Sequence, residues 1–120
     1  MKKFEDIVRE HHQVLEAAMG SAEQAFTVAR EICLLALSNK GRLLVCGNGG
    51  SAADAQHFAA ELVGRFVKER SAYAAIALST DTSIITALAN AYGVESIFSR
   101  QVEALGRPGD VLIALSTRGN

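Results

Sequence analysis

A short apolar run that leads directly into a glycine-rich loop and then into a helical pattern constrains this chain more than any other feature. Residues 43–46 (Leu-Leu-Val-Cys) have the character of a buried strand, and residues 47–50 (Gly-Asn-Gly-Gly) allow backbone conformations that a Cβ atom disfavours. Ser51 is a common N-cap residue, so a helix is predicted to begin there. Unpaired backbone N–H groups and the helix dipole at such a turn favour a bound phosphate or sulfate.

The loop differs from the two common nucleotide-binding motifs. It lacks the G-x-G-x-x-G spacing. It also lacks the lysine that follows the glycines in the phosphate loop of nucleoside triphosphatases. A nucleotide is therefore not the first expectation. An ordinary tight turn between a strand and a helix remains the alternative interpretation when the loop is considered alone.

Three ionisable side chains follow on one face of the predicted helix. His57 and Glu61 are four residues apart, and Asp54 lies one turn before His57. The imidazole and the Glu61 carboxylate can share a divalent metal, or the carboxylate can take a proton from carbon while the imidazole orients a substrate oxygen. The alternative is a solvated His–Glu pair, with Asp54 completing a capping pattern with Ser51. We expect the capping role for Asp54 and a functional role for His57 and Glu61.

Helical and strand patterns alternate along most of the chain. Strands are predicted near residues 42–46, 74–79 and 110–115, and helices near residues 51–67, 82–91 and 95–105. This alternation is typical of the α/β class with a parallel sheet. Two amphipathic helices are predicted before the first strand, with an interruption at Gly20-Ser21 and a C-cap signal at residues 39–41. We expect residues 1–40 to form a helical pair used in oligomerisation, and residues 41–120 to form part of an α/β domain.

The carboxyl ends of the predicted strands indicate where a ligand would bind. In open parallel sheets, ligands bind beyond these ends, where the loops after Cys46, Leu78 and Leu115 fall. Residues 79–83, which are rich in serine and threonine, are therefore additional candidates. For Asp81 we expect the simpler role of capping the helix that follows.

Several motifs, taken in order, carry a family resemblance. The strongest are Cys-Gly-Asn-Gly-Gly-Ser at residues 46–51 and Asp-Ala-x-His-Phe-x-x-Glu-Leu-x-Gly-Arg at residues 54–65. Further matches lie at residues 75–79, 90–93, 97–104, 109–112 and 116–117. On these motifs, residues 41–120 resemble the sedoheptulose 7-phosphate isomerases, also called phosphoheptose isomerases, of the sugar isomerase (SIS) domain superfamily. The resemblance implies a three-layer α/β/α sandwich around the parallel sheet, and a homotetramer with the N-terminal helices at its centre.

The resemblance also implies roles for individual residues. His57 and Glu61 would bind one Zn²⁺ per subunit, and Glu61 would also contact the substrate and act as the catalytic group in proton transfer. The other substrate contacts would come from Asn48, Gly49, Gly50, Ser51, Asn90, Ser116 and Thr117. The implied reaction converts sedoheptulose 7-phosphate to D-glycero-D-manno-heptose 7-phosphate through an enediolate, in ADP-heptose and lipopolysaccharide core biosynthesis. Such a reaction needs a base that lifts a carbon-bound proton, and an acid or a metal that stabilises the enediolate oxygen.

The chain departs from the family pattern in two places. Arg118 stands where the family has a second serine, and its guanidinium could either pair with the substrate phosphate or block the pocket by its bulk. The chain also stops at Asn120, before the segments that supply the remaining zinc ligands of the family, a glutamine and a histidine. That histidine is the usual acid–base partner of the glutamate. We therefore expect a truncated chain that is inactive by itself.

Composition narrows the class of partner and the compartment. The formal net charge is −1 and no basic cluster interleaves with aromatic residues, so nucleic acid is not expected as a ligand. No apolar run reaches the length of a membrane-spanning helix, and the N-terminus does not resemble a signal peptide. Cys33 and Cys46 are too few for a disulfide framework and are expected to be reduced. We expect a cytoplasmic protein that binds a phosphorylated sugar.

Two functions from different classes remain after this reading. The first is the isomerase, which the presence of His57 and Glu61 favours. The second is a noncatalytic SIS-fold protein that binds phosphosugars or acts as a scaffold, as in the related replication initiator-associating protein. The position of the chain end at Asn120 favours either this second function or an isomerase from which the catalytic half has been removed.

Overall fold

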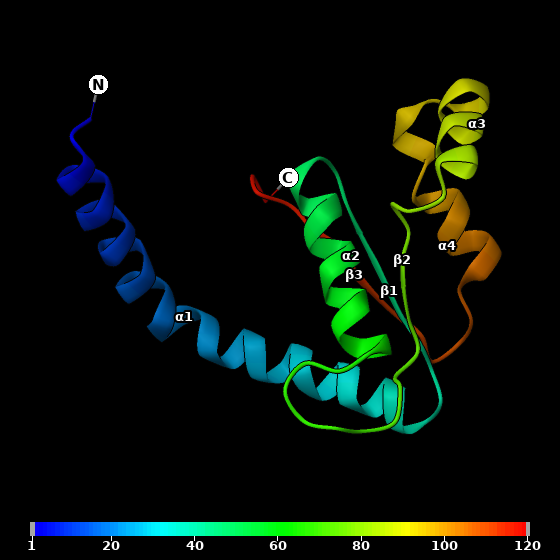
Figure 1. Cartoon of the computed structure of the whole chain (residues 1–120), viewed down its shortest axis with the longest axis horizontal. Coiled ribbons are helices and arrows are strands. Elements are labelled where there is room, and N and C mark those ends of the chain that lie inside the picture. The colour runs from blue at the N-terminus through cyan, green and yellow to red at the C-terminus, as the bar shows by residue number, and fades with distance from the viewer. Residues whose placement is uncertain (1, 120) are drawn as a thin grey trace. The chain divides into compact units, whose positions relative to one another are not determined.

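The computed structural model describes residues 2–119 and has the predicted α/β architecture (Figure 1). The elements are α1 (Phe4–Ser38), β1 (Leu43–Gly47), α2 (Gly50–Val63), β2 (Ala75–Ala77), α3 (Thr82–Tyr92), a 3₁₀ helix η1 (Val94–Ser96), α4 (Ser99–Leu105) and β3 (Val111–Leu115). Contacts divide the chain into a first unit that ends at Ile32 and a second unit that begins at Cys33. The sheet and all candidate site residues belong to the second unit.

The sheet has three parallel strands in the order β2-β1-β3. Leu43 at the start of β1 pairs with Ala75 of β2 and with Val111 of β3. Because β1 is the central strand, all five of its residues are buried, which agrees with its continuous apolar sequence. The pairing continues to Gly47 and Leu115, so the loops that follow β1 and β3 begin beside one another.

Helices cover both faces of the sheet, which confirms the predicted three-layer sandwich (Figure 1). Successive residues of a strand point to opposite faces, so Val45 packs against Ala55 and Ala59 of α2, while Leu44 and Cys46 pack on the other side. That second side is completed by Leu78 and by partly buried side chains, namely Ile76, Phe98 and Val102. The small alanines of α2 allow this helix to lie close to the sheet.

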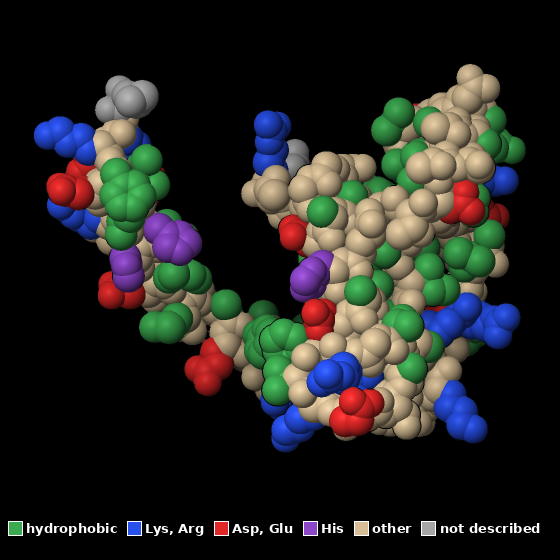
Figure 2. Space-filling view, in the orientation of Figure 1, with side chains coloured by type: hydrophobic (Ala, Val, Ile, Leu, Met, Phe, Trp, Pro, Cys, Tyr) green, Lys and Arg blue, Asp and Glu red, His purple; other side chains and the backbone are tan. Residues whose placement is uncertain are grey.

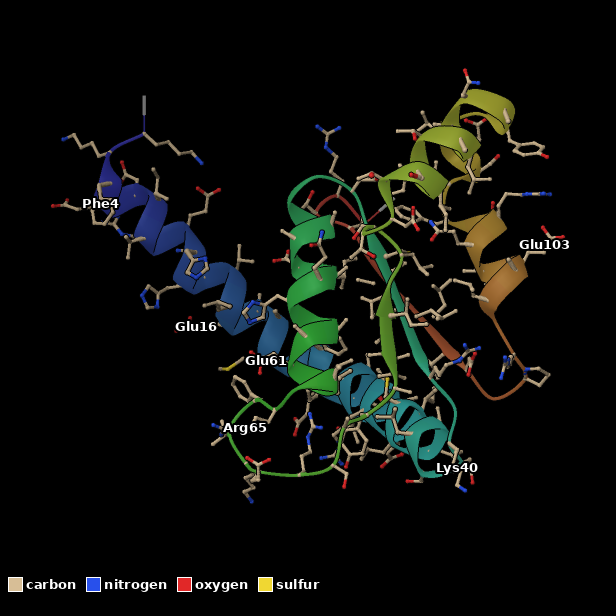
Figure 3. All side chains as sticks on the ribbon, turned by 45° about the vertical axis from the view of Figure 1, so that its right-hand side comes forward. Phe4, Glu16, Lys40, Glu61, Arg65 and Glu103 are labelled. Atoms are coloured by element: carbon tan, nitrogen blue, oxygen red, sulfur yellow. The ribbon has the colours of Figure 1, made fainter. Side chains whose placement is uncertain are left out.

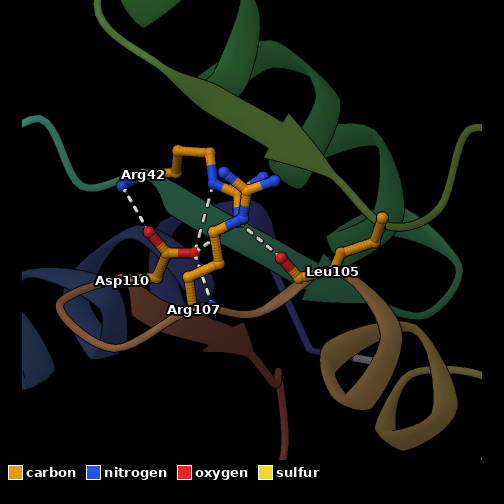
Figure 4. A network of polar contacts seen from close by, with 4 residues as sticks. All are labelled: Arg42, Leu105, Arg107 and Asp110. Carbon is orange, nitrogen blue, oxygen red and sulfur yellow. Dashed lines mark hydrogen bonds and ion pairs between the residues drawn. The ribbon is translucent and has the colours of Figure 1, made fainter.

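A polar network joins the starts of β1 and β3 (Figure 4). The backbone N–H and the guanidinium of Arg42 both donate to the carboxylate of Asp110, at 2.8 Å and 2.7 Å. The same guanidinium donates to the carbonyl of Leu105, and the backbone N–H of Arg107 donates to Asp110 at 3.0 Å. This carboxylate therefore fixes the turn that leads from α4 into β3.

The prediction of two N-terminal helices is wrong, because α1 is one continuous helix that passes through Gly20 and Ser21. A single glycine in a helix costs only about 1 kcal/mol relative to alanine, and the neighbouring residues are good helix formers. The hydroxyl of Ser21 donates to the carbonyls of Ala17 and Ala18 in the preceding turn, so it does not compete with the helix. The predicted stop near residue 40 is confirmed: Lys40 has a positive φ of 62°, and the backbone N–H of Gly41 donates to the carbonyl of Ala36 at 2.8 Å.

Many apolar side chains of α1 are exposed on its surface (Figure 2). Ala36 alone of the described residues of this helix is buried. Phe4 and Phe26 are 78% and 70% exposed. Between residues 2 and 119, no helix is both long enough and apolar enough to span a membrane.

Other boundaries shift by a few residues from the predicted ones. The predicted helix 51–67 ends at Val63, because Gly64 follows and its backbone N–H closes the last turn onto Ala60. The predicted helix 95–105 is divided into η1 and α4. Strand β2 is limited to three residues, since the chain turns at Leu78 toward α3.

Candidate functional site

The glycine-rich loop forms the predicted junction between β1 and α2, with one change in detail. Gly49, with φ of 58°, precedes the helix, and Ser51 is the second helical residue rather than the predicted cap. No side chain caps α2, so the predicted capping pattern of Ser51 and Asp54 is also wrong. The reason is that glycine adopts the positive φ that this entry into the helix requires. Within residues 2–119, the backbone N–H groups of Gly49 and Gly50 find no hydrogen-bond acceptor.

The first and second predicted phosphate loops meet at one pocket of about 340 Å³. Its lining consists of Cys46, Gly47, Asn48, Ser51, Phe98, Ala114, Leu115, Ser116, Thr117 and Arg118. Five residues predicted to contact substrate are thus brought together, namely Asn48, Ser51, Ser116, Thr117 and Arg118. The pocket lies beyond the carboxyl ends of β1 and β3, where a parallel sheet is expected to bind its ligand.

Four predicted contacts lie outside this lining, namely Gly49, Gly50, Asn90 and Glu61, the last of which lines a second cavity described below. Gly49 and Gly50 flank the pocket in sequence, but their atoms do not line it. Asn90 is exposed on α3. Asp81 caps that helix by accepting from the backbone N–H of Ile84 at 2.9 Å, which confirms its predicted structural role.

The second loop owes its shape to Ser116. The hydroxyl oxygen of Ser116 accepts from the backbone N–H groups of Arg118 at 3.3 Å and Gly119 at 3.0 Å. These bonds close a tight turn immediately after β3. Thr117 and Arg118 therefore project from a defined turn at the edge of the pocket.

The sequence analysis missed one residue that lines the pocket and another that supports it. Phe98 lines the pocket from the segment just before α4. Gln101, only 5% exposed, donates through Nε2 to the carbonyls of Leu78 at 2.9 Å and Ile97 at 2.8 Å. These bonds hold the start of α4 against the end of β2 and so position Phe98. A lone glutamine among apolar residues at helical spacing was the available signal.

Cys46 also belongs to the pocket lining. Burial raises the pKa of its thiol above the ordinary value, because the charged thiolate loses solvation. The residue therefore behaves as a small apolar group at neutral pH, as its sequence context predicts. Neither Cys33 nor Cys46 forms a disulfide.

His57 and Glu61 lie on a second cavity, of about 460 Å³, along the same helix. Its lining is Asp54, His57, Phe58, Glu61, Leu62, Phe66 and Arg70. His57 Nε2 and Glu61 Oε1 are 3.4 Å apart, with side chains that are 78% and 33% exposed. The other carboxylate oxygen, Glu61 Oε2, is buried and has no hydrogen-bond partner among residues 2–119. Such an oxygen is available to accept a proton or a ligand.

Arg70 stabilises the end of α2 that carries Glu61. Its guanidinium donates to the carbonyls of Glu61 at 2.6 Å and Leu62 at 2.9 Å, and it stacks 4.4 Å from the ring centroid of Tyr73. A positive charge there also complements the negative end of the helix dipole. Figure 3 shows Glu61 near this end of α2 and Arg65 in the loop that follows.

The described residues do not complete a zinc site by themselves. Zinc in proteins takes three or four protein donors, and no group of three histidine, cysteine, aspartate or glutamate side chains between residues 2 and 119 is arranged to hold a metal. His57 and Glu61 offer two donors at most. We therefore derive no chemical step through zinc.

Comparison with known proteins agrees with this arrangement. A family model described as the SIS domain matches residues 7–120. The phosphoheptose isomerase of Bordetella avium is 56% identical over 112 residues, which make up 93% of this chain and 57% of that protein. The phosphoheptose isomerase of Aromatoleum aromaticum is 56% identical over 119 residues, or 99% of this chain and 58% of that protein.

The likeness extends to three dimensions. The structure of phosphoheptose isomerase from Neisseria gonorrhoeae matches with a TM-score of 0.82 and 45% identity, covering 96% of this chain and 61% of that one. This chain thus spans somewhat more than half the length of the relatives that it matches. Since the SIS model covers nearly the whole sequence, the chain belongs to the SIS domain family.

Proposed function

We propose that this chain carries the phosphate-binding loops and the catalytic base of a sugar-phosphate isomerase that converts sedoheptulose 7-phosphate to D-glycero-D-manno-heptose 7-phosphate. The reaction would belong to ADP-heptose and lipopolysaccharide core biosynthesis, in the cytoplasm. The similarity to proteins named phosphoheptose isomerase supports this choice of substrate. The observation that carries the proposal is the buried, unpartnered carboxylate oxygen of Glu61.

The first pocket suits the phosphate end of the substrate. The amide of Asn48 and the hydroxyls of Ser51 and Thr117 provide hydrogen-bond donors around it, and the free backbone N–H groups of Gly49 and Gly50 flank it in sequence. The dipole of a 14-residue helix adds a partial positive charge at the same place. A phosphate ester bound there leaves its carbon chain free to extend along α2.

Glu61 suits the carbonyl end. A ketose becomes an aldose when a base removes a proton from C1, giving an enediolate, and the proton is returned to C2, while the hydroxyl proton of C1 is transferred to the oxygen of C2. Glu61 would hold the carbon-bound proton between these two transfers, and His57, 3.4 Å away, would orient a substrate oxygen. A positioned base of this kind accelerates proton transfer about 10²- to 10⁴-fold.

The separation of the two cavities favours a long sugar. Ser51 and Glu61 are ten residues apart on one helix, which corresponds to about 15 Å along its axis at about 1.5 Å per residue. A substrate held by its phosphate at one end must place its carbonyl near the other end. A seven-carbon chain phosphorylated at C7 spans more of this distance than a triose phosphate does, and the Glu61 side chain must reach over the remainder.

Zinc and self-association complete the proposal. His57 and Glu61 would supply two donors of a Zn²⁺ site whose further ligands lie beyond the described residues. The exposed apolar residues of α1 would be buried in a homo-oligomer, as the resemblance to phosphoheptose isomerases implies a tetramer. Residues 1–40 would then form the oligomerisation region, and residues 41–120 part of the SIS domain.

The decisive experiment follows the base step alone, which Glu61 can perform even in a chain that is expected to be inactive in the full isomerisation. Sedoheptulose 7-phosphate is incubated in D₂O with the 120-residue chain, with added zinc, and deuterium at C1 is measured by NMR, alongside a coupled assay for heptose 7-phosphate. Glu61→Gln should lower deuterium incorporation at least about 100-fold, because an amide cannot accept the carbon-bound proton. The matched control is Glu69→Gln, since the Glu69 side chain is 86% exposed and pairs only with Arg65 on the surface.

Equal incorporation by the parent and by Glu61→Gln would show that Glu61 is not the base. A parent chain that binds the phosphosugar without any exchange would contradict catalysis by this chain, and would favour a noncatalytic phosphosugar-binding protein.

A further inference from the structure

Charge is distributed unevenly around the pocket where the two loops meet. Among the ten residues that line it, Arg118 is the one with a formal charge, and no carboxylate is present to neutralise it. Its guanidinium makes no hydrogen bond or ion pair with any residue between 2 and 119. A cation at the edge of a polar pocket that holds no anion of its own favours an anionic ligand.

Some hydrogen-bond donors of the second loop stabilise the loop itself, and others are available to a ligand. The backbone N–H groups of Arg118 and Gly119 are both used by the hydroxyl oxygen of Ser116, so they cannot also bind an anion without opening the turn. The groups left over are the hydroxyl of Thr117 and the guanidinium of Arg118, neither of which is engaged within residues 2–119. The second loop therefore presents its strongest donor through the Arg118 side chain.

The first loop contributes the hydroxyl of Ser51 to the same pocket. Ser51 is only 5% exposed and lines the pocket, and its hydroxyl has no hydrogen-bond partner among residues 2–119. Glu61 Oε2 is the one buried polar side-chain atom without a partner among the described residues, so the hydroxyl oxygen of Ser51 keeps access to the pocket and can donate to a ligand there. This observation, which is independent of Arg118, indicates that the pocket is built for a polar ligand.

We propose that Arg118 is the principal charged ligand of the substrate phosphate and replaces a hydroxyl donor by a bidentate guanidinium. The proposal rests on the proposed function only in taking a phosphate monoester as the ligand class. Guanidinium stays charged at all physiological pH values and matches two phosphate oxygens at once, so the site selects the dianion of a terminal phosphate. Because Arg118 is exposed, its side chain can turn onto the ligand without breaking any interaction within the described chain.

Direct binding tests this role without requiring catalysis. The dissociation constants of inorganic phosphate and of sedoheptulose 7-phosphate are measured by calorimetry for the parent chain and for Arg118→Gln, Arg118→Lys and Arg118→Ser. Loss of one charged hydrogen-bonding partner should weaken binding about ten- to hundredfold in Arg118→Gln, with a smaller loss in Arg118→Lys. Raised salt should weaken binding by the parent more than binding by Arg118→Gln.

The control variant is Arg107→Gln, which removes the same charge from an exposed arginine outside the pocket and should leave binding unchanged. Unchanged affinity in Arg118→Gln, tighter binding by Arg118→Ser, or a parent chain that binds no phosphate would each overturn the proposal. Tighter binding by Arg118→Ser would show that the arginine obstructs the pocket. Deuterium exchange at C1 reports the isomerase function separately, so either idea can fail while the other stands.

Discussion

At the scale of single residues, Asp110 shows how one carboxylate can determine a turn. Hydrogen bonds from the Arg42 side chain hold its pKa below the ordinary value, with smaller effects from the backbone N–H groups of Arg42 and Arg107 and against an opposing effect of burial. Since the pKa is lowered in the folded state, the stabilisation is complete above the ordinary pKa of about 3.9. It is lost as the pH falls through the lower, folded-state pKa.

Asp110→Asn should therefore lower the free energy of unfolding at neutral pH, and the difference from the parent should shrink as the solution is acidified below about pH 4. Urea unfolding followed by circular dichroism at several pH values measures both effects. Glu103→Gln is the control, because the Glu103 side chain is 74% exposed and should give a small and nearly constant difference. A difference for Asp110→Asn that grows toward acid would contradict the lowered pKa.

Some residues of the site could be predicted from the sequence, and others could not. Asn48, Ser51, Ser116 and Thr117 follow parallel strands, so the common direction of those strands was sufficient to expect them at one pocket. The bond between Arg42 and Asp110 joins positions 68 apart and leaves no periodic signal in the sequence.

At the scale of elements, the junction of β1 and α2 depends on a close approach at Gly47. A Cβ atom on Gly47 would lie 2.7 Å from both the Cβ and the carbonyl oxygen of Ser51. Gly47→Ala should therefore destabilise the fold by about 1–3 kcal/mol, since the strand and the helix must move apart. Chemical unfolding of the purified variant measures the loss.

Gly50→Ala provides the matched comparison, because a Cβ there meets nothing within 4 Å. Its stability should equal or slightly exceed that of the parent, as alanine favours helix more than glycine does. Equal stability of the two variants would show that the approach of α2 to β1 tolerates a side chain at Gly47.

The elements differ in how well the sequence predicts them. Strand β1 was predicted almost to its ends, since a central parallel strand is apolar throughout. The predicted start of α2 is one residue late. Serine is a common N-cap residue, which favoured Ser51, but the backbone of Gly49 supplies the positive φ that the start of the helix requires. The false interruption in α1 arose because a Gly-Ser pair signals a turn only when the flanking residues do not favour helix.

At the scale of the whole molecule, the parallel sheet follows from the alternating patterns, and the helices on both faces were implied by the family resemblance, whereas the strand order β2-β1-β3 was not predicted. The separate positions of the phosphate pocket and the Glu61 cavity do not follow from those patterns. Glu61 and the phosphate loops were all predicted to contact one substrate, whereas they line two cavities at different points along α2. Because a helix rises about 1.5 Å per residue, the ten-residue spacing between Ser51 and Glu61 separates the two cavities along the helix axis.

The exposed apolar residues of α1 also concern the whole molecule, because we expect another subunit to cover them. Leu15 is 50% exposed and belongs to an apolar stripe with Phe4, Val8, Met19 and Phe26. Leu15→Glu should raise the subunit dissociation constant about tenfold or more, because one leucine buried in an interface contributes roughly 1.5–3 kcal/mol and a carboxylate there adds a desolvation cost. Sedimentation velocity over a range of concentrations measures this dissociation constant.

Gln24→Glu adds the same charge on the opposite side of the helix and should leave assembly intact. A parent chain that stays monomeric at high concentration would show that another partner covers this helix, whereas equal dissociation of both variants would assign the effect to charge alone and not to the apolar stripe.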